Sequence, residues 1–304
     1  MLKLNIKNET AALRSVVLGT ALSCGPVPTP QEAYDPKSLE HILAGTYPKE
    51  VDMVKEMDAF ATVLRKYGVQ VFRPKVLQGR NQIFARDIAF VIGNKLIKAN
   101  IIPDREEEFE AIKYVLDRID EDQIVYPPAE VHIEGGDVMP WNEYIFIGTY
   151  SGPDYSNYIT ARTNRAAVDF IAGSFPGKKV KSFELRKSNT DPKANALHLD
   201  CCFQPIGEDR AILHKNSFIR EAEYQWLFDR FGSDKVFEIT DSEMYHMMSN
   251  IFSISLEVVV SERKFTRLNN WLREHGFTVE EIPYAEIAKQ GGLLRCSTLP
   301  LARE

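Results

Sequence analysis

The stretch Gly291-Gly292-Leu293-Leu294-Arg295-Cys296-Ser297-Thr298-Leu299-Pro300 places a cysteine after two glycines and an arginine, near the end of the 304-residue sequence. Glycines allow tight turns and close backbone approach, and a neighbouring guanidinium lowers the pKa of a thiol. The stretch therefore predicts a nucleophile with an enlarged thiolate fraction. Because a lone cysteine is more often a small buried residue, this interpretation depends on what the rest of the chain supplies.

Composition is that of an ordinary globular chain, with 44% hydrophobic and 26% charged residues. The net charge of −6 gives no basic footprint for nucleic acid or anionic lipid. No apolar run approaches the roughly 18 residues that a membrane span needs, and the start of the sequence lacks the apolar region of a signal peptide. We therefore expect a cytoplasmic protein with no nucleic-acid or membrane partner.

Four cysteines, at positions 24, 201, 202 and 296, have neither CxxC spacing nor the density of a disulfide scaffold. Reduced thiols are expected. The pair Cys201-Cys202 near His198 lacks a second ligand cluster and makes a poor zinc site, so no metal is predicted. We expect the pair to lie in the core.

A module of amphipathic helix, turn and short strand recurs along the chain, at intervals of roughly 40 to 60 residues. The expected helices are 48–66, 104–119, 157–172, 218–231 and 262–275, and the strands that follow them are 67–72, 123–126, 179–183, 235–239 and 276–280. Five copies indicate a repeat architecture of α/β type. The strand at 13–19 would complete the last repeat by pairing with 299–304, so that both ends of the sequence close a ring.

Each of those strands is followed by a polar insertion. The insertions are Ala85-Arg86-Asp87, Glu134-Gly135-Gly136-Asp137, His198-Leu199-Asp200, Ser249-Asn250 and the stretch that carries Cys296. In a ring of repeats, equivalent insertions converge on the axis. Side chains that are distant in the sequence are therefore expected to meet there.

The residue types at these positions predict covalent catalysis. Cys296 would be the nucleophile, His198 the general acid and base, and Glu134 the carboxylate that orients the imidazole. Asp87 and Asp200 remain, and two aspartates at a dry site favour a cationic partner, for which a planar guanidinium with its fork of donors fits best. Asp137 is expected to form a turn or support its neighbours, and Asn250 to satisfy backbone groups.

These motifs, in this order, resemble those of the guanidino-group-modifying enzymes, which include arginine deiminase, dimethylarginine dimethylaminohydrolase and the amidinotransferases. The resemblance implies the pentein fold, a five-bladed pseudo-symmetric α/β propeller that forms a single domain over residues 1–304. It also implies an amidino-cysteine (thiouronium) intermediate, no cofactor and a small guanidino substrate, and it leaves a homodimer open. Thr160-Ala161-Arg162-Thr163 resembles the stretch in which an arginine grips the substrate carboxylate, so Arg162 is a predicted substrate-binding residue.

Alternatives stay open at this level. Alone, Glu134-Gly135-Gly136-Asp137 is most often a turn, His198 a hydrogen-bonded core residue and Arg162 a solvated residue on a helix face. The main prediction is a hydrolase acting on the guanidino C–N bond of arginine or a substituted arginine. An amidinotransferase uses the same residues, and a non-catalytic pentein binding protein would lack the triad. A cysteine peptidase is disfavoured, since Asp87 and Asp200 would have no task. A loop at 150–158 is expected to cover the mouth of the site.

Overall fold

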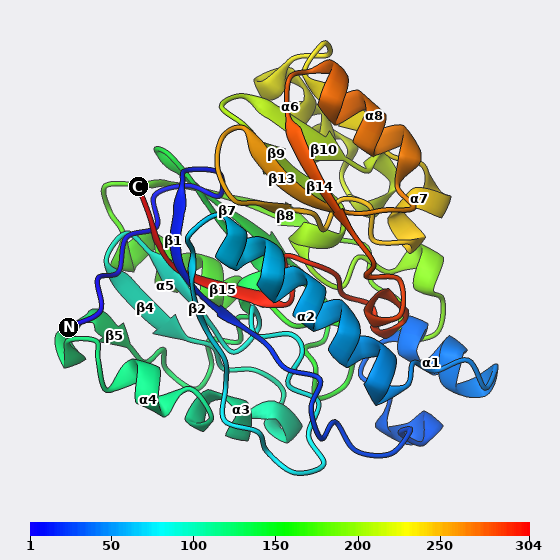
Figure 1. Ribbon diagram of the computed structural model, residues 1–304. Coiled ribbons are helices and arrows are strands. Elements are labelled where there is room, and N and C mark those ends of the chain that lie inside the picture. Colours follow the sequence, from blue (N-terminus) through cyan, green and yellow to red (C-terminus); the bar gives the residue numbers. More distant parts are fainter.

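Five three-stranded sheets succeed one another along the chain in the computed structural model, which describes residues 1–304 (Figure 1). In each sheet the middle strand runs antiparallel to the first strand and parallel to the third. In that order the sheets are β15 (Thr298–Arg303), β1 (Leu13–Leu18) and β2 (Gln70–Phe72); β3 (Ala89–Ile92), β4 (Lys95–Lys98) and β5 (Ile124–Val125); β6 (Val138–Trp141), β7 (Tyr144–Thr149) and β8 (Lys179–Glu184); β9 (Phe203–Ile206), β10 (Arg210–Leu213) and β11 (Val236–Glu238); β12 (Phe252–Ser253), β13 (Val258–Glu262) and β14 (Thr278–Ile282).

Helical segments connect the middle strand of each sheet to its third strand, because parallel neighbours need a long crossover. The helices are α1 (Pro36–Leu43), α2 (Glu50–Lys66), α3 (Glu107–Glu110), α4 (Lys113–Leu116), α5 (Arg165–Ser174), α6 (Glu221–Phe231), α7 (Asp241–Tyr245) and α8 (Thr266–Glu274), of which α7 alone lies after a third strand. Short 3-10 turns are η1 (Pro30–Glu32), η2 (Pro103–Arg105), η3 (Glu121–Gln123), η4 (Gly135–Asp137), η5 (Pro192–Ala194), η6 (Leu199–Cys201), η7 (Lys215–Ser217) and η8 (Ile287–Gln290). The predicted five-bladed α/β propeller is confirmed.

The first blade combines both ends of the sequence. β15 pairs antiparallel with β1, in a register that joins Leu13 to Arg303 and Leu18 to Thr298. The two labelled ends of the chain accordingly lie on the same side of the molecule in Figure 1. The expectation that 299–304 pairs with the strand at 13–19 is confirmed.

Three of the predicted helices match the structure closely, whereas two differ. The helix expected at 104–119 is divided into η2, α3 and α4. Four glutamates crowd residues 106–110, and like charges at helical spacing destabilise a helix, while Arg105 is drawn away into an ion pair with Asp87 at 2.8 Å.

The helix expected at 157–172 begins instead at Arg165. Asn164 is extended and caps it, its side chain accepting the backbone N–H of Ala167 at 3.1 Å. Residues 157–164 therefore form turns and extended backbone, and Arg162 lies in a loop rather than on a helix face. Helix α1 and strands β6 and β12 were not anticipated.

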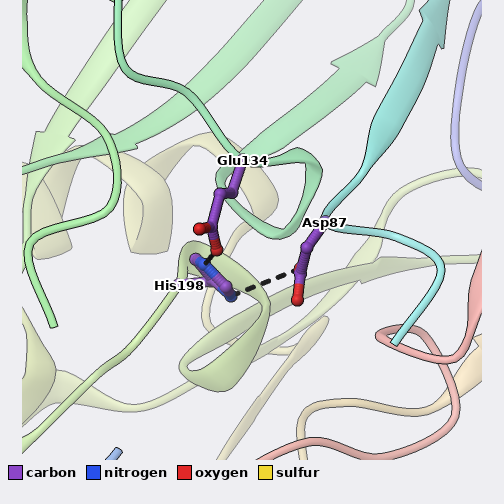
Figure 2. Close-up of side chains that lie close together, drawn as sticks. All are labelled: Asp87, Glu134 and His198. Carbon is purple, nitrogen blue, oxygen red and sulfur yellow. Dashed lines mark hydrogen bonds and ion pairs between the residues drawn. The ribbon is translucent and has the colours of Figure 1, made fainter. Parts of the chain in front are cut away.

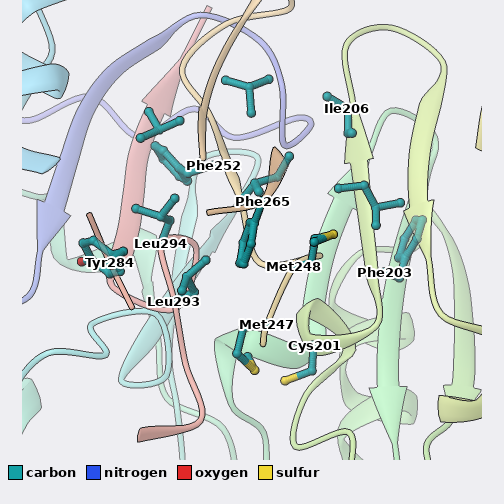
Figure 3. Packing of buried hydrophobic residues seen from close by; sticks show 14 of the residues in the cluster. Cys201, Phe203, Ile206, Met247, Met248, Phe252, Phe265, Tyr284, Leu293 and Leu294 are labelled. Carbon is teal, nitrogen blue, oxygen red and sulfur yellow. The ribbon is translucent and has the colours of Figure 1, made fainter. Parts of the chain in front are cut away.

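The largest hydrophobic cluster joins 49 buried residues beneath four of the sheets. Figure 3 shows how Leu293 and Leu294 pack in it near Phe252 and Tyr284. The stretch that carries Cys296 is thus anchored by two leucines on the core side. Cys201 and Cys202 lie in the same cluster, as expected of core residues.

No helix has both the length and the apolar character needed to cross a bilayer. The cytoplasmic location, the homodimer and the single domain over residues 1–304 stay predictions.

Candidate active site

The polar insertions lie just ahead of the first strand of each blade. Asp87 precedes β3, Glu134 precedes β6, His198 precedes β9, Asn250 precedes β12 and Cys296 precedes β15. Equivalent ends of five first strands therefore carry these side chains, and all five are buried. Hydrogen bonds and ion pairs join neighbouring insertions near the axis.

His198 lies between two carboxylates (Figure 2). Its Nε2 atom is 2.8 Å from Oε2 of Glu134, and its Nδ1 atom is 3.8 Å from Oδ1 of Asp87. The ring rests directly on Gly136, where a Cβ atom would lie 2.5 Å from Nδ1 of the histidine. The second glycine of the Glu-Gly-Gly-Asp motif is therefore required by close approach to the imidazole.

Arg162 contacts the other side of Glu134. Its Nη1 atom donates to both carboxylate oxygens at 3.1 and 3.2 Å. Its remaining nitrogens donate to the carbonyl oxygens of Tyr34 at 2.7 Å and Ile159 at 2.5 Å. Burial alone would raise the pKa of Glu134, but Arg162 and His198 outweigh it and lower that pKa to about 2.

The two carboxylates keep His198 protonated at neutral pH. Burial disfavours the imidazolium, yet the charge of Asp87 and the hydrogen bond to Glu134 raise the pKa of His198 to about 9. The histidine can therefore donate a proton although its side chain is buried.

Asp87 is held by an arginine that the sequence analysis did not single out. Arg105 donates from Nη1 to Oδ2 of Asp87 at 2.8 Å and binds Glu108 through Nε and Nη2 at 2.8 and 3.0 Å. The other oxygen of Asp87, Oδ1, has no hydrogen-bond partner. Burial raises the pKa of Asp87, and His198 and Arg105 oppose that rise.

Cys296 and Asp200 form the second part of the site. The Sγ atom of Cys296 lies 3.5 Å from Oδ2 of Asp200 and 3.2 Å from Nδ2 of Asn250. Asn250 also accepts the backbone N–H of Cys296 at 3.1 Å and donates to the backbone carbonyl of Asp200 at 3.3 Å. Asn250 therefore contacts the thiol itself, beyond the backbone role expected for it.

The expectation that Arg295 lowers the pKa of the Cys296 thiol is wrong. Burial raises that pKa well above its usual value, and the charges of Asp200 and Asp87 raise it further. The guanidinium of Arg295 is engaged elsewhere, by Asp200 at 2.8 Å and by Glu9 at 3.1 Å. Sequence adjacency placed the two residues together but could not indicate the direction of the arginine side chain.

The two glycines ahead of Cys296 allow close contacts with other segments. A Cβ atom on Gly291 would lie 2.6 Å from Oδ1 of Asp35, the residue that caps α1, and the φ of this glycine is +73°. A Cβ atom on Gly292 would lie 2.4 Å from Cε1 of Phe84. The pair thus fits between α1 and the Asp87 insertion.

A cavity of about 830 Å³ opens onto these side chains. Asp87, Arg162, His198 and Cys296 contribute to its wall, and the outer wall comes from segments in the ranges 24–50 and 79–84. Residues 150–158 are not part of the lining. The expectation of a covering loop at 150–158 is therefore not supported, and the segment 24–50, which includes α1, supplies many of the lining residues instead.

Asp87, Glu134 and His198 offer ligand atoms that lie within 4.8 Å of one another, a spacing that could hold a metal ion. Glu134 already binds His198 and Arg162, and Arg105 binds Oδ2 of Asp87. Two guanidinium groups beside the cluster oppose a further cation, so we assign no metal to it.

Sequence reasoning identified the three predicted catalytic residues and the two aspartates as neighbours, but it missed what binds them. Arg105, Glu108 and Glu9 were not anticipated, and neither was the contact of Asn250 with the thiol. Buried charge pairs of this kind depend on side-chain direction across blades. The one available signal for Arg105 was a basic residue inside an otherwise acidic run.

Fold and site together define the guanidino-modifying class of pentein proteins. The protein-family model described as N,N dimethylarginine dimethylhydrolase, eukaryotic, matches residues 48–303, and the chain belongs to this family.

Two relatives in sequence are an uncharacterized protein and an arginine deiminase. The uncharacterized protein YkgA of Bacillus subtilis (strain 168) is 29% identical over 243 residues, covering 79% of this chain and 77% of that protein. An arginine deiminase of Bacillus cereus (strain ATCC 10987 / NRS 248) is 25% identical, and the match covers 74% of this chain but only 62% of the deiminase.

Solved structures with the same fold include hydrolytic and transferring enzymes. The N-terminal domain of ArgZ, an arginine dihydrolase from cyanobacteria, has a TM-score of 0.76 at 17% identity, and the match covers 95% of this chain and 97% of that domain. SxtG, an amidinotransferase from Microseira wollei, has a TM-score of 0.77 at 16% identity over 99% of this chain and 97% of that one. The family match supports guanidino-modifying chemistry, and these solved structures show that the fold is shared.

Proposed function

We propose that this protein is a cysteine-dependent hydrolase that cleaves the guanidino C–N bond of arginine or a substituted arginine, releasing a ureido product and an amine or ammonia. The observation that carries the proposal is that Cys296 and His198 line one cavity, with Glu134 bound to His198 and Asp200 beside the thiol. The whole chain, 1–304, would act as one catalytic domain without a cofactor.

The substrate guanidinium would bind between the two aspartates. Oδ1 of Asp87 has no hydrogen-bond partner, and Oδ2 of Asp200 lies 3.5 Å from the thiol. A planar guanidinium can donate to both carboxylates while its central carbon faces Sγ of Cys296. Binding would also supply the positive charge that these buried carboxylates favour.

That charge would activate the nucleophile. Burial, Asp200 and Asp87 hold Cys296 as a neutral thiol at rest, since they raise its pKa. Once a cation occupies the space between the aspartates, their effect on the thiol is offset and the thiol can release its proton to solvent. The thiolate then forms a bond to the guanidino carbon.

His198 would carry the protons of both half-reactions. Protonated at rest, it donates its proton to the departing nitrogen as the C–N bond breaks and leaves the amidino group on sulfur. The neutral imidazole then takes a proton from water as the water oxygen bonds to the same carbon. Cleavage of the C–S bond releases the ureido product, and the departing thiolate takes up the proton of the added hydroxyl and returns to the resting thiol.

Glu134 would orient and charge the imidazole, and Arg162 would keep Glu134 ionised. Arg162 also lines the cavity, and its Nη2 atom binds the carbonyl of Tyr34 on the same wall. We therefore keep Arg162 as a proposed contact for the substrate tail. In that role it would exchange the Tyr34 carbonyl for a substrate carboxylate.

A substrate panel tests the proposal. The protein is incubated with arginine, methylated arginines, agmatine, and arginine plus glycine, and ureido groups and ornithine are measured. A ureido product from at least one guanidine alone, absent with Cys296→Ala, is the expected result. Ornithine formed only when glycine is present, with no ureido product, would instead establish amidino transfer and overturn the hydrolase.

A non-catalytic binding protein gives a third outcome. In that case no guanidine is turned over, and Cys296→Ala binds guanidines as the unsubstituted protein does. Labelling of Cys296 by a haloacetamidine, followed by peptide mass spectrometry, would argue against it because labelling requires an accessible and activated thiol.

A further inference from the structure

The segment ahead of β1, residues 5–12, together with the first residue of β1, contacts the other four blades at the end of the ring opposite to the polar insertions. We call it the N-terminal strap. Each insertion precedes the first strand of a blade, whereas the strap contacts the turn that follows that strand, so the two sets of contacts lie at opposite strand ends.

The contacts of the strap visit the blades in order. Backbone hydrogen bonds join Ile6 to Gly93 at 2.8 and 2.7 Å and Lys7 to Asn142 at 3.0 Å. These partners lie in the β3–β4 and β6–β7 turns.

The next two blades are contacted in the same way. The Thr10 hydroxyl donates to the carbonyl of Gly207, in the β9–β10 turn, at 2.7 Å, and the Leu13 N–H at the start of β1 donates to the carbonyl of Ile254, after β12, at 2.8 Å. A segment that follows the turns of successive blades encircles the axis.

Glu9 lies within this strap and is buried, with 4% of its surface exposed. Its two carboxylate oxygens accept Nε and Nη2 of Arg295, both at 3.1 Å. This is the side-on, two-bond geometry in which a carboxylate fixes the plane of a guanidinium. Glu9 thus reaches along the axis from the strap to the residue that precedes the nucleophile.

The other donors of Arg295 are used on the catalytic side. Nη1 donates to Oδ2 of Asp200 at 2.8 Å and to the carbonyl of Gly136 at 3.4 Å, and Nη2 donates to the carbonyl of Val138 at 2.9 Å. The planar guanidinium of Arg295 therefore positions the Asp200 carboxylate and the backbone around Gly136 at the same time. Oδ2 of Asp200 is the same oxygen that lies 3.5 Å from Sγ of Cys296.

We propose that Glu9 is a positioning residue of the active site, which fixes Arg295 from the far end of the axis so that Arg295 holds Asp200 beside Cys296. Glu9 touches neither the thiol nor the cavity. Its negative charge offsets that of Arg295, which leaves Asp200 free to attract a substrate cation. Only the expected change in KM rests on the proposed function.

Removing the negative charge of Glu9 is expected to have opposite effects on turnover and on the reactivity of the Cys296 thiol. Without the Glu9 charge, Asp200 would be drawn to an uncompensated Arg295 and would bind a guanidinium less well. The same added positive charge would stabilise the Cys296 thiolate against the effects of Asp200, Asp87 and Cys201, the groups that raise the pKa of this thiol. A loss of folding would not separate the two effects in this way.

The test compares Glu9→Gln with Glu304→Gln. Glu304 is half exposed, pairs with Lys3 and Arg14 at 3.1 and 3.2 Å, and lies beside the same chain ends without contacting the site. For Glu9→Gln we expect KM for the best guanidine to rise by about 10- to 100-fold, the range for losing one charged hydrogen-bond partner. We expect Glu304→Gln to change it less than twofold, and Glu9→Asp to recover part of the loss.

Alkylation by iodoacetamide gives the second readout and needs no turnover. At a pH below the thiol midpoint, the rate at Cys296 in Glu9→Gln should rise about tenfold, as for a pKa lowered by about one unit, while buried Cys201 and Cys202 stay unlabelled by mass spectrometry. An unchanged rate at Cys296, or equal labelling of all three buried cysteines, would overturn the positioning role. Raised alkylation with no guanidine turnover in any variant would leave the positioning role standing and remove the proposed function alone.

Discussion

The two halves of the site handle charge in opposite ways. The half around His198 brings a histidine, two carboxylates and two arginines together so that the imidazole stays charged at neutral pH. The half around Cys296 has a carboxylate and an amide against the sulfur, which leaves the thiol neutral. His198 can donate a proton at rest, whereas Cys296 would lose its proton only after a cation binds.

This difference indicates where the substrate contributes. A resting thiolate next to a charged histidine would be reactive toward any electrophile that entered the cavity. In the proposed mechanism, a neutral thiol between two aspartates would be activated only when a guanidinium or a similar cation binds. Selectivity for a cationic substrate would then come from the two aspartates beside the sulfur, where the covalent bond forms.

The Cys296 half depends on β15, so removing that strand should have the largest effect. β15 follows the nucleophile directly and pairs with β1 along its full length. Truncation after Pro300 should open the first blade and abolish activity together with cooperative unfolding, measured by turnover and by thermal melting. Normal activity with an unchanged melting curve would contradict the coupling of ring closure to the site.

The His198 half should fail when Arg162 is replaced. In Arg162→Leu, Glu134 is left buried without its cation, and breaking a buried pair costs about 3–5 kcal/mol of stability. The pKa of Glu134 should rise and that of His198 should fall, so we expect kcat to drop by about 10²–10³-fold, within the range for general acid catalysis.

Arg165→Leu is the matched control for this variant. Arg165 pairs at 3.4 Å with Asp169, and both side chains are about two-thirds exposed. Exposed pairs of this kind contribute roughly 0–1 kcal/mol, so kcat and the melting temperature should stay near those of the unsubstituted protein. Equal losses in the two variants would mean that Arg162 has no special role.

Asn250→Ala should produce a smaller loss in the Cys296 half. The substitution removes the donor to Sγ and the acceptor for the Cys296 N–H, while both carboxylates remain. We expect kcat/KM to fall by about 10- to 100-fold, the cost of one or two hydrogen bonds at a buried site. An unchanged kcat/KM, with the variant folded by circular dichroism, would show that Asn250 does not position the nucleophile.

The pH dependence of kcat is the smallest of the expected effects that distinguish the two halves of the site. Because the pKa of His198 in the folded protein is about 9, above its usual value of 6.5, kcat should fall as pH rises through about 9. The stabilisation from this group is fully present below about pH 6.5 and is lost over the same rise. In Glu134→Gln the falling limb should move to lower pH, and a limb that stays near 9 would remove Glu134 as a cause of the shift.

The sequence predicted the arrangement of the site better than its electrostatics. Five helix–strand modules with a polar residue after each were enough to place Asp87, Glu134, His198 and Cys296 on one axis, because strand order fixes where the insertions meet. The direction of a side chain such as Arg295 depends on packing across blades, so its turn toward Glu9 could not be read from adjacency. The same limit explains the wrong expectation for the thiol pKa.

Local element boundaries failed where tertiary contacts overrode periodicity. Arg105 leaves its expected helix to bind Asp87, and Asn164 starts α5 later than the apolar spacing indicates. Both departures occur beside the site. In each case a buried polar contact replaces regular helix.

Activation of Cys296 by the substrate cation can be tested with two alkylating reagents of similar size, cationic chloroacetamidine and neutral iodoacetamide. At pH 7 we expect chloroacetamidine to label Cys296 readily and iodoacetamide to do so only at high pH, and we expect Asp200→Asn to remove this preference. Rapid labelling by iodoacetamide at pH 7, with a midpoint at or below about 8.5, the value for a free thiol, would contradict the claim that the substrate cation activates the nucleophile.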